Sequence, residues 1–598
     1  MAAFDGLTMS AVKTEIENNF MNGRVDRIHQ PQKETIIISF RTKAKFHRLL
    51  VSARADASRI HIIREKMDNP PHPPVFCMVL RKHLEGARLV GIQQKGLERV
   101  LTLHFTTINE AGVQEEKLLN CEIMGRHSNI VLVDEASGHV VDGIRRYSHQ
   151  KNRYREILPG VKYKLPPSQN KANLISLNEN NFREQVLSHE VMIRMEKILL
   201  KTLQGFSPQA CAEVIFRAGL PNHITLDECG EYELNRIWDV LQQIKFMLES
   251  KNFKPTLVHH PDLPNGYKAF APMDQKKYPD ERKRHLQTIS DALETYYHYR
   301  EEQGQYNSMK QSLERILSRE IRKSRKKIAK QDRELASAED YERHKIAGEL
   351  ITANIYRLSK GDSILRTENY YSQDGETITI TLEPSLTPSQ NAQRYFKKYR
   401  KGQVSGEKIN RQLSINKREL AYLESVSNSV ELAESTGELF EIAEELRKGK
   451  YLKQSVKKHR TQGMPSFISF SSSDGYQILI GKNNRQNDHI TMRLARAGDL
   501  WFHTKDIPGA HIVVKKRDEE DFPERTILEA AVLAAHYSKG RFSSNVAVDY
   551  TDRKNVRKTK GAKPGMVIYD NHRTLYVTPD KSRLESILKN NSNVTGNP

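Results

Sequence analysis

Residues 409–423 read INRQLSINKRELAYL, and their large side chains recur at the spacing of one helix face. The steps of 4, 3, 4 and 3 residues are those of a coiled-coil seam, where a single polar residue fixes how two helices align. We therefore expect a long helix that pairs with a second one. The seam positions are Ile409, Leu413, Asn416, Leu420 and Leu423.

A second charged stretch with the same periodicity lies upstream, with its seam at Leu313, Leu317, Ile321 and Ile328. We expect an outgoing helix over 280–358, an inserted tip domain over 359–392 and a returning helix over 393–447. The insert holds an Asp374-Gly375 turn and an alternating strand. Together these segments predict an antiparallel coiled-coil arm. A parallel coiled coil between two chains is the alternative.

The segments before the arm predict two different domains. Residues 1–168 contain many strand-like runs and a few helical ones, which indicates a mixed α/β domain. Residues 169–262 change to short helices, with Gly205 and Pro208 in a tight turn between two apolar runs. This turn resembles a helix-hairpin-helix, whose backbone N–H groups contact phosphate. A plain corner between two helices fits equally well.

After the arm, residues 450–565 predict a second α/β domain, with strands around the Asp474-Gly475 turn and an alanine-rich helix. Residues 566–598 predict a C-terminal strand and a tail. The expected fold class is therefore a multidomain α+β protein.

The charge balance is the strongest signal in the composition. The 598 residues include 95 Lys and Arg against 74 Asp and Glu, a formal net charge of +21. Such an excess favours a polyanionic partner, although a merely basic soluble protein is the plain alternative. The sequence has no run of about 18 apolar residues and no signal-peptide pattern at its start. We expect a cytoplasmic protein without a membrane partner.

The sequence gives no sign of a cofactor or a metal. The cysteines form no CxxC pair, which favours reduced, mostly buried thiols over zinc ligands or disulfides. A Walker loop, the dinucleotide-binding glycine pattern and the kinase motifs are absent, so nothing predicts nucleotide hydrolysis. The four cysteines are Cys77, Cys121, Cys211 and Cys229.

The stretch WFHTKDIPGAHIVVKK, residues 501–516, is the best candidate for a catalytic or metal site, because two histidines and Asp506 fall close together. No GxSxG nucleophile turn occurs, and a zinc site would need a third or fourth ligand converging from nearby, so a catalytic site is disfavoured. A nucleic-acid surface, or a turn shaped by the Pro508-Gly509 pair, fits better. The residues expected to contact RNA are Trp501, His503, Lys505 and His511.

Several charged residues of the first domain are candidates for nucleic-acid contact. Arg41 ends a strand, and Arg126 and His127 occupy a turn before another strand. Glu98 and Arg99 stand together at a strand start. A carboxylate can accept from a base amino group while a guanidinium binds phosphate in a fork. An exposed ion pair of little consequence is the alternative.

The order of long motifs along the chain resembles the NFACT family over nearly its whole length. The motifs are FDGLTM (4–9), PPVFCMVLRKHLEG (73–86), EIMGRHSNI (122–130), LPPSQNK (165–171), GELITANIYRL (348–358), LTPSQNAQRYFKKY (386–399), DGYQILIGKNNRQND (474–488) and LWFHTKDIPGAHIVV (500–514).

This resemblance implies a ribosome quality-control factor and not an enzyme. Family members bind a large ribosomal subunit that still holds a stalled peptidyl-tRNA, and they recruit alanyl-tRNA. The ribosome then adds a C-terminal alanine tail without mRNA, and the tail marks the chain for degradation. A small RNA-binding protein can assist. The resemblance also implies an N-terminal fold similar to that of formamidopyrimidine-DNA glycosylases.

The resemblance also implies which residues carry the contacts. The family's tRNA-recruiting Asp-Arg pair corresponds to Glu98-Arg99, where the longer carboxylate changes reach, and Asp5 matches an acidic family position. The first domain and the hairpin turn face tRNA, while the arm and the C-terminal domain hold the large subunit. The arm residues expected to contact the ribosome are Arg322, Lys326, Lys397 and Lys398.

Two other classes of function remain open. The first is a surface adhesin that binds fibronectin, as an older name of the family suggests; surface labelling of intact cells would test it. The second is a DNA-repair enzyme, which the glycosylase-like fold and the hairpin suggest. Residues 2 and 3 are alanine, however, and not a catalytic proline or glutamate.

Overall fold

The computed structural model describes the chain in two compact units, Met1–Glu302 and Gln303–Pro598. Each unit is a mixed α and β structure with hydrophobic cores of its own. The described residues are 4–42, 46–108, 112–150, 153–261, 263, 266–338, 341–372, 376–453, 467–517, 521–580 and 584.

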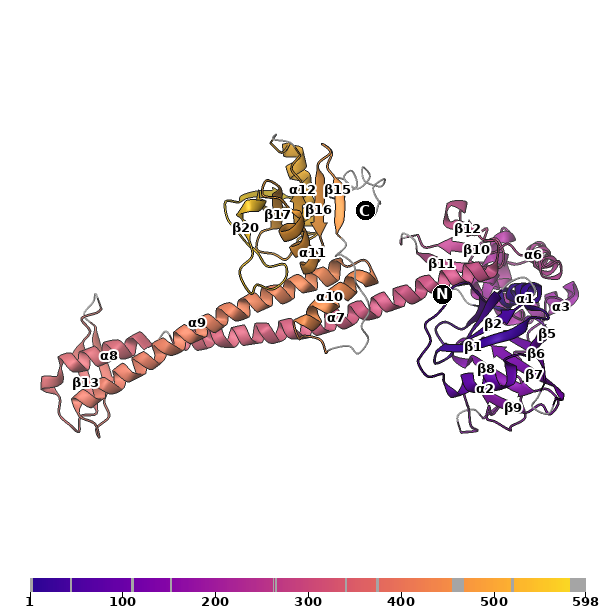
Figure 1. Cartoon of the computed structure of the whole chain (residues 1–598), viewed down its shortest axis with the longest axis horizontal. Helices are drawn as coiled ribbons and strands as arrows, with labels where there is room; N and C mark the ends of the chain where they lie inside the picture. Colours follow the sequence, from indigo (N-terminus) through magenta and orange to yellow (C-terminus); the bar gives the residue numbers. More distant parts are fainter. Residues whose placement is uncertain are drawn as a thin grey trace. The chain divides into compact units, whose positions relative to one another are not determined.

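A nine-stranded antiparallel sheet forms the first domain, in the order β4-β3-β2-β1-β5-β6-β7-β8-β9 (Figure 1). Most neighbouring strands also follow one another in the chain, so short turns connect them. The strands are β1 (Arg24–Gln32), β2 (Thr35–Arg41), β3 (Phe46–Ser52), β4 (Arg59–Ile63), β5 (Arg88–Gln94), β6 (Val100–Ile108), β7 (Gln114–Glu122), β8 (Asn129–Asp134) and β9 (Val140–Gly143).

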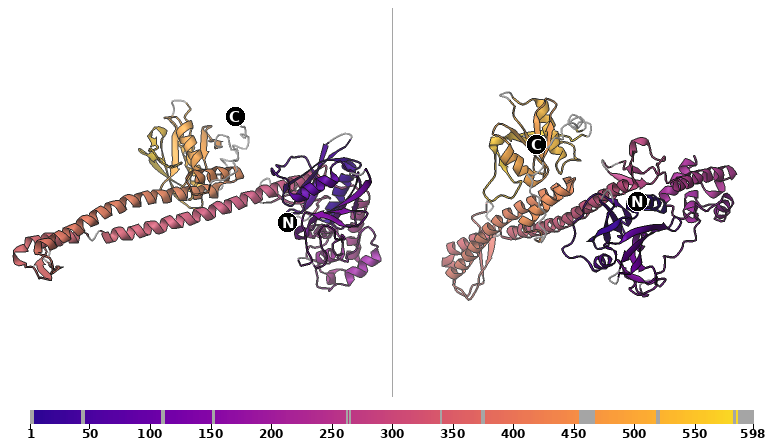
Figure 2. Two further views of the ribbon diagram at one scale, coloured as in Figure 1. Left: turned by 60° about the horizontal axis from the view of Figure 1, so that its bottom comes forward. Right: turned by 45° about the vertical axis from the view of Figure 1, so that its right-hand side comes forward.

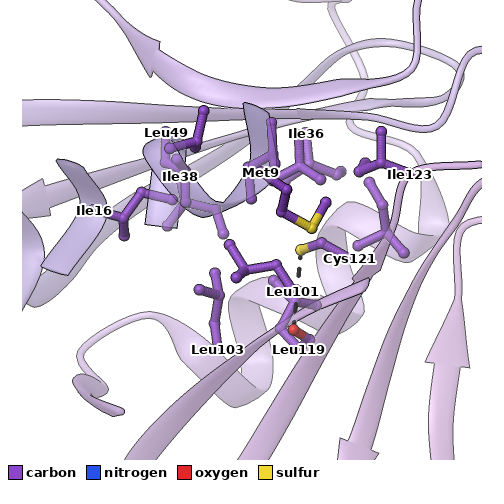
Figure 3. Close-up of a cluster of buried hydrophobic side chains, with 14 of the residues drawn as sticks. Met9, Ile16, Ile36, Ile38, Leu49, Leu101, Leu103, Leu119, Cys121 and Ile123 are labelled. Carbon is purple, nitrogen blue, oxygen red and sulfur yellow. Dashed lines mark hydrogen bonds between the residues drawn. The ribbon is translucent and has the colours of Figure 1, made fainter. Parts of the chain in front are cut away.

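Two helices pack on this sheet. In α1 (Gly6–Phe20) the apolar side chains recur at helical spacing and are fully buried at Met9, Val12, Ile16 and Phe20. Figure 3 shows Met9 and Ile16 among side chains from the strands, including Ile38 and Cys121. Each such burial stabilises the fold by about 1.5–3 kcal/mol. Helix α2 (Val75–Leu84) begins after Pro74, as the proline-rich approach predicts.

A helical domain follows, built from α3 (Glu179–Leu187), α4 (Met195–Thr202), α5 (Pro208–Arg217) and α6 (Glu231–Glu249). Its core also contains Leu7 and Leu97 from the first domain, so the two domains share apolar contacts. A three-stranded sheet comes next, in the order β11-β10-β12, with β10 (Thr256–His259), β11 (Tyr267–Ala271) and β12 (Lys283–His285).

The charge pattern predicted that the outgoing helix begins at residue 280, and this start is wrong. Residues 280–282 form a short 3-10 turn, and β12 then pairs with β10. The long helix α7 (Ile289–Ala338) starts only afterwards. The backbone of β12 satisfies its hydrogen bonds in a sheet, which overrides the helical appearance of a highly charged segment.

Helix α7 pairs with α9 (Pro388–Leu432) in the second unit, and the two lie side by side in Figures 1 and 2. Lys310 Nζ donates to Glu431 O over 3.1 Å, and Lys327 Nζ donates to Asn416 Oδ1 over 3.1 Å. Partner numbers fall along α9 as they rise along α7, so the two helices are antiparallel.

Several predicted seam residues join these helices: Leu313, Leu317 and Leu423 share one apolar cluster, and Asn416 bonds to α7. Leu313 and Leu317 are buried, as are Leu413, Asn416 and Leu423. The remaining seam positions are half-buried: Ile321, Ile328, Ile409 and Leu420.

The returning helix is divided, contrary to the single helix expected over 393–447. Helix α9 ends at Leu432, and Ser435 caps a separate helix, α10 (Thr436–Lys448). The Ser435 hydroxyl accepts from the Glu438 N–H, which satisfies an N-terminal donor of the new helix. Helix α10 then packs its apolar face against α9.

The tip combines α8 (Tyr341–Ala353), the first turns of α9 and a two-stranded sheet, β13 (Ile364–Glu368) and β14 (Thr377–Thr381). Its small core includes Leu350, Ile351, Leu365 and Ile380. The strands flank the predicted turn, but Asp374 and Gly375 lie outside the described residues.

The C-terminal domain has a six-stranded sheet in the order β15-β16-β18-β17-β19-β22. The predicted C-terminal strand, β22 (Arg573–Val577), is therefore an integral edge strand of this domain. The other elements are β15 (Ile468–Ser471), β16 (Gln477–Gly481), α11 (Asn484–His489), β17 (Leu500–Thr504), β18 (His511–Val514), α12 (Glu524–His536), β19 (Val546–Asp552), β20 (Val556–Arg557) and β21 (Ile568–Tyr569).

Within the described ranges, no helix combines the length and apolar content needed to span a membrane.

Candidate nucleic-acid interface

A cavity of about 270 Å³ in the first unit brings together three of the six predicted tRNA-binding residues, Asp5, Glu98 and Arg99, with Gly205 and Pro208 of the hairpin turn. Four segments that are distant in sequence line it: the start of α1, the β5–β6 turn, the loop that contains LPPSQNK, and the α4–α5 turn. The lining residues are Asp5, Leu97, Glu98, Arg99, Gln169, Lys171, Leu200, Gln204, Gly205, Phe206, Ser207 and Pro208.

Two glycines allow these segments to meet. The Gly6 N–H donates to Gly205 O over 2.8 Å. A Cβ on Gly6 would stand 2.0 Å from Leu97 O, and a Cβ on Gly205 would stand 2.3 Å from the same oxygen. Gly205 also has φ +76, in the left-handed region that favours glycine. The hairpin turn therefore depends on glycine for both space and backbone conformation.

Asp5 lines the cavity, and its carboxylate is engaged in hydrogen bonds within the protein. It is buried and caps α1, accepting from the Thr8 N–H and the Thr8 hydroxyl over 2.8 Å. The Ser207 hydroxyl donates to its second oxygen over 2.6 Å. Burial raises the pKa of Asp5, and these hydrogen bonds oppose that rise. Asp5 thus ties α1 to the start of α5.

Glu98 is oriented by its neighbours. Gln204 Nε2 donates to the Glu98 carboxylate over 2.8 Å, and Gln204 Oε1 accepts from the Leu97 N–H over 3.0 Å. This one glutamine locks the β5–β6 turn to the α4–α5 turn. In the predicted pair Glu98-Arg99, the Glu98 carboxylate is therefore held in place by Gln204. The N–H donors of the Arg99 guanidinium form no side-chain hydrogen bond with described residues.

The cavity has unpaired positive charge. Arg99 and Lys171 are half-buried, and neither forms an ion pair or a side-chain hydrogen bond with any residue that the structure describes. Burial lowers the pKa of Lys171, and the nearby Arg99 charge adds to that effect. The N-terminus of α5 also lies at this cavity; Pro208 has no N–H and the Ala210 N–H donates to the Ser207 hydroxyl, so the helix contributes through its dipole. The arrangement suits a phosphate group.

The sequence interpretation missed Lys171 and Gln204 as parts of this site. Lys171 ends the LPPSQNK motif, so the motif itself was the available signal. The remaining predicted tRNA residues do not line the cavity. Arg41 is exposed, stacks over Phe46 at 5.1 Å and lies 3.7 Å from an Asp26 oxygen.

Arg126 and His127 are exposed on a 3-10 turn, Gly125–His127, also away from the cavity. The Arg126 Nε donates to His127 Nε2 over 2.9 Å.

In the C-terminal domain, two of the four predicted RNA contacts are wrong. Trp501 is fully buried and lies edge-on to His511 at 5.1 Å, and His511 is itself buried. Burial lowers the pKa of His511 well below its ordinary value and that of half-buried His503 to about 4. Both rings are therefore neutral near pH 7 and cannot attract phosphate as cations. Lys505 remains exposed.

The four arm residues predicted to contact the ribosome are all exposed. They form no ion pair within the described part of the chain, so their charges are available to an external polyanion. They are Arg322, Lys326, Lys397 and Lys398.

No group of three or more His, Cys, Asp or Glu side chains that could hold a metal occurs among the described residues. The predicted reduced thiols are present: all four cysteines are free, three are buried and Cys229 is half-buried.

Comparison with known sequences identifies the family. Residues 5–463 match the sequence model described as "NFACT N-terminal and middle domains". Residues 466–571 match the one described as "NFACT protein RNA binding domain". The chain belongs to the NFACT family. This agrees with the motif order in the sequence, from FDGLTM to LWFHTKDIPGAHIVV.

Two bacterial relatives match over nearly the full length of both chains. A protein of Bacillus subtilis named Rqc2 homolog RqcH is 37% identical, over 98% of this chain and 100% of that protein. A Streptococcus suis protein of the same name is 33% identical over the same shares. The human ribosome quality control complex subunit NEMF is 22% identical, over 90% of this chain and 56% of that protein.

One solved structure has a different name. The C-terminal part of the fibronectin/fibrinogen-binding protein from Streptococcus suis is 35% identical, over 47% of this chain and 98% of that one, with a TM-score of 0.37.

The NFACT motif DGYQILIGKNNRQND joins the RNA binding domain to the helices of the second unit. Lys482, almost fully buried, forms ion pairs with Glu434 (3.1 Å) and Glu438 (2.7 Å). The Asn484 amide donates to buried Glu445 over 3.0 Å. These contacts of the motif are polar, whereas Met566 adds an apolar contact to the core of α9 and α10.

Proposed function

We propose that this NFACT protein is a ribosome-associated quality-control factor that binds large ribosomal subunits carrying a stalled peptidyl-tRNA. It recruits alanyl-tRNA and directs mRNA-independent C-terminal alanine tailing of the nascent chain for degradation. The full-length match to proteins named Rqc2 homolog RqcH supports this proposal. The observation that carries the tRNA part is the cavity with unpaired Arg99 and Lys171 beside the hairpin turn.

In this proposal the protein positions tRNA and catalyses nothing. Arg99 and Lys171 hold a phosphate of the tRNA backbone, because two cations lie beside the positive end of the α5 dipole there. Glu98, fixed by Gln204, accepts from a base amino group or a ribose hydroxyl. The ribosome forms the peptide bonds, so no cofactor is needed.

The helices α4 and α5 act as a helix-hairpin-helix, with Gly205 and Pro208 in its phosphate-facing turn. The helices α7 and α9 act as a coiled-coil arm that carries the tip to the ribosome. The exposed arm cations and Lys505 contact rRNA through their charge. A small RNA-binding protein assists on the same subunit.

The central test is Arg99→Ala in the full-length protein. We expect the tRNA that copurifies with the tagged protein to fall about 10-fold, because a guanidinium–phosphate contact is lost. Alanine tailing falls with it. Lys245→Ala on α6 is the charge-matched control, since Lys245 lies outside the cavity. Full tRNA occupancy in Arg99→Ala would overturn the assignment.

A second measurement tests the identity of the RNA partners. The RNA bound to the tagged protein is sequenced after purification from cells. We expect large-subunit rRNA together with one dominant tRNA, that of alanine. An even mixture of all tRNAs would contradict selective recruitment, and an absence of rRNA would contradict subunit binding.

A further inference from the structure

A second cavity, of about 190 Å³, lies on the other side of the start of α5 in the first unit. Pro208 lines the first cavity and Gln209, the next residue, lines this one. The walls come from α5, β11 and the loop that follows β11. The lining residues are Gln209, Ala212, Lys268, Ala269, Gln275, Lys277 and Tyr278.

Gln275 presents an unused donor here. Its side chain is 1% exposed. Its Oε1 accepts from Gln209 Nε2 over 3.1 Å, and Gln209 Nε2 also donates to Phe270 O over 3.1 Å. The Gln275 Nε2 has no hydrogen-bond partner among the described residues. This nitrogen is itself buried, and a buried donor without an acceptor costs free energy, so an acceptor that reached it through the cavity would be favoured.

The loop that carries Gln275 is fixed in advance. Buried Glu213 accepts from the Lys276 N–H over 2.8 Å and from the Lys277 N–H over 3.2 Å. Arg217 Nε donates to the same carboxylate over 2.7 Å, and Arg217 Nη2 donates to Asp274 O over 2.5 Å. These hydrogen bonds satisfy the Glu213 carboxylate, and they fix the loop that forms the cavity wall in the absence of a ligand.

The open charge at this cavity is positive. Lys268 is exposed with its Nζ 5.3 Å from the Tyr278 ring centre, and Lys277 is half-buried. Neither ammonium group forms an ion pair within the ranges that the structure describes. Asp274 is already paired with Lys283 at 3.2 Å. One buried amide donor and two unpaired ammonium groups suit an anion with acceptor oxygens.

We propose that this cavity is a second phosphate-binding subsite, which takes a backbone phosphate of RNA next to the one held at the Arg99 cavity. The proposal rests on the tRNA-binding function proposed above. The volume is below the roughly 300 Å³ at which small-molecule pockets begin, so a phosphate group fits better than an enclosed free nucleotide. Adjacent residues at the start of α5, Pro208 and Gln209, line the two cavities.

The first test is Gln275→Glu, measured as the affinity of the full-length protein for deacylated total tRNA. The substitution keeps the acceptor for Gln209 and places a carboxylate oxygen where the free amide nitrogen stood. We expect about 10-fold to 100-fold weaker binding. Gln242→Glu is the matched control, because the Gln242 Nε2 is also buried and unpartnered but Gln242 does not line the cavity.

The second test is Lys268→Ala, an exposed position whose loss does not threaten folding. We expect the slope of log affinity against log salt to fall by about one, as for the loss of one phosphate contact. Lys245→Ala is the control. An unchanged slope in Lys268→Ala with an unchanged affinity in Gln275→Glu would overturn the subsite.

The two proposals fail in distinguishable ways. If Arg99→Ala loses tRNA while Gln275→Glu and Lys268→Ala do not, the second subsite is wrong and the function stands. If none of the three loses tRNA, both are wrong. Inorganic phosphate and ATP serve as competitors at equal concentration. Displacement of tRNA by either at micromolar concentration would assign the cavity to a free anion and overturn the RNA assignment.

Discussion

Individual buried residues decide how the first unit responds to its conditions. His61, in β4, is 1% exposed, and its ring nitrogen Nε2 accepts from Arg59 Nε over 3.3 Å. Burial, and then the Arg59 charge, lower the pKa of His61 to about 3. The folded protein therefore keeps this ring neutral at pH values where an unfolded chain would protonate it.

The first prediction concerns pH. His61 has an unfolded pKa near 6.5, so only the unfolded chain gains this proton as pH falls from about 6.5 toward 3. The free energy of unfolding of the first unit should then fall by up to about 1.4 kcal/mol per pH unit from this residue. Hydrogen exchange of the nine-stranded sheet measures it. The His61→Gln variant should lose less unfolding free energy than the unsubstituted protein as the pH falls from 7. Identical dependence of stability on pH in the two proteins would contradict this prediction.

The second prediction concerns the hairpin turn. Gly205→Ala places a Cβ 2.3 Å from Leu97 O at a φ of +76, so both space and backbone oppose it. We expect a loss of about 2–4 kcal/mol in unfolding free energy, together with tRNA affinity. Gly160→Ala is the control, with φ +81 and no atom within 4 Å. It should cost only about 1 kcal/mol by urea unfolding. Equal costs would show that the close contact is unimportant.

At the scale of elements, the pairing of α7 with α9 depends on one polar layer within an apolar seam. Asn416 is 6% exposed. It accepts from Lys327 Nζ over 3.1 Å and donates to Gln331 over 2.5 Å. Neighbouring positions are leucines that any shifted pairing could also bury. A buried amide with fixed partners therefore favours one register over the others.

The third prediction tests this layer. Asn416→Ala leaves Gln331 without its partner and should lower the unfolding free energy of the helix pair by about 1–3 kcal/mol. Ile415→Ala, next in sequence but 50% exposed, should change it by less than about 0.5 kcal/mol. Urea unfolding of both variants, monitored by the circular dichroism signal of the helices, measures these changes. A larger loss in Ile415→Ala would contradict the seam assignment.

At the scale of the whole molecule, charge is the dominant property. The formal net charge is +21, and the cations singled out on α7 and α9 are exposed without ion pairs to described residues. Attraction of this kind to a polyanion weakens steeply with salt, because released counterions drive it.

The fourth prediction follows from this charge. Co-sedimentation of the protein with purified large subunits should fall steeply between about 50 mM and about 200 mM salt. Replacing Arg322, Lys326, Lys397 and Lys398 with Glu should weaken it further and reduce the salt dependence. Lys245→Ala is again the control. Unchanged co-sedimentation of the fourfold variant would contradict the proposal that these arm residues contact the ribosome.

Prediction from sequence worked where local periodicity carries the information. The heptad steps of residues 409–423 are confirmed as one face: Leu413, Asn416 and Leu423 are buried, and Ile409 and Leu420 are half-buried. It failed at residues 280–288, where pairing with β10 outweighed a helix-like composition. The break between α9 and α10 was visible in hindsight as a Ser435 cap with Glu438 three residues on.

The sequence allowed us to predict which residues belong to the candidate site, but not that they meet in one cavity. Glu98-Arg99, Gly205 and Pro208 were each named from sequence, but nothing in their spacing brings them to one cavity. Trp501 was assigned to a surface because one strand cannot tell whether its sheet is covered on one face or two. The structure has apolar clusters on both faces, with Phe502 in one and Trp501 in the other.

The sequence alone determined the elements, the charge and the family resemblance, because periodicity, composition and motif order are properties of neighbouring residues. The tertiary structure alone decided which residues meet. Lys171 joins Arg99, Asp5 turns inward to Ser207, and Gln275 keeps a donor free beside α5. Those outcomes depend on contacts between residues up to about 200 positions apart, as Asp5 and Ser207 are, and no local pattern encodes such contacts.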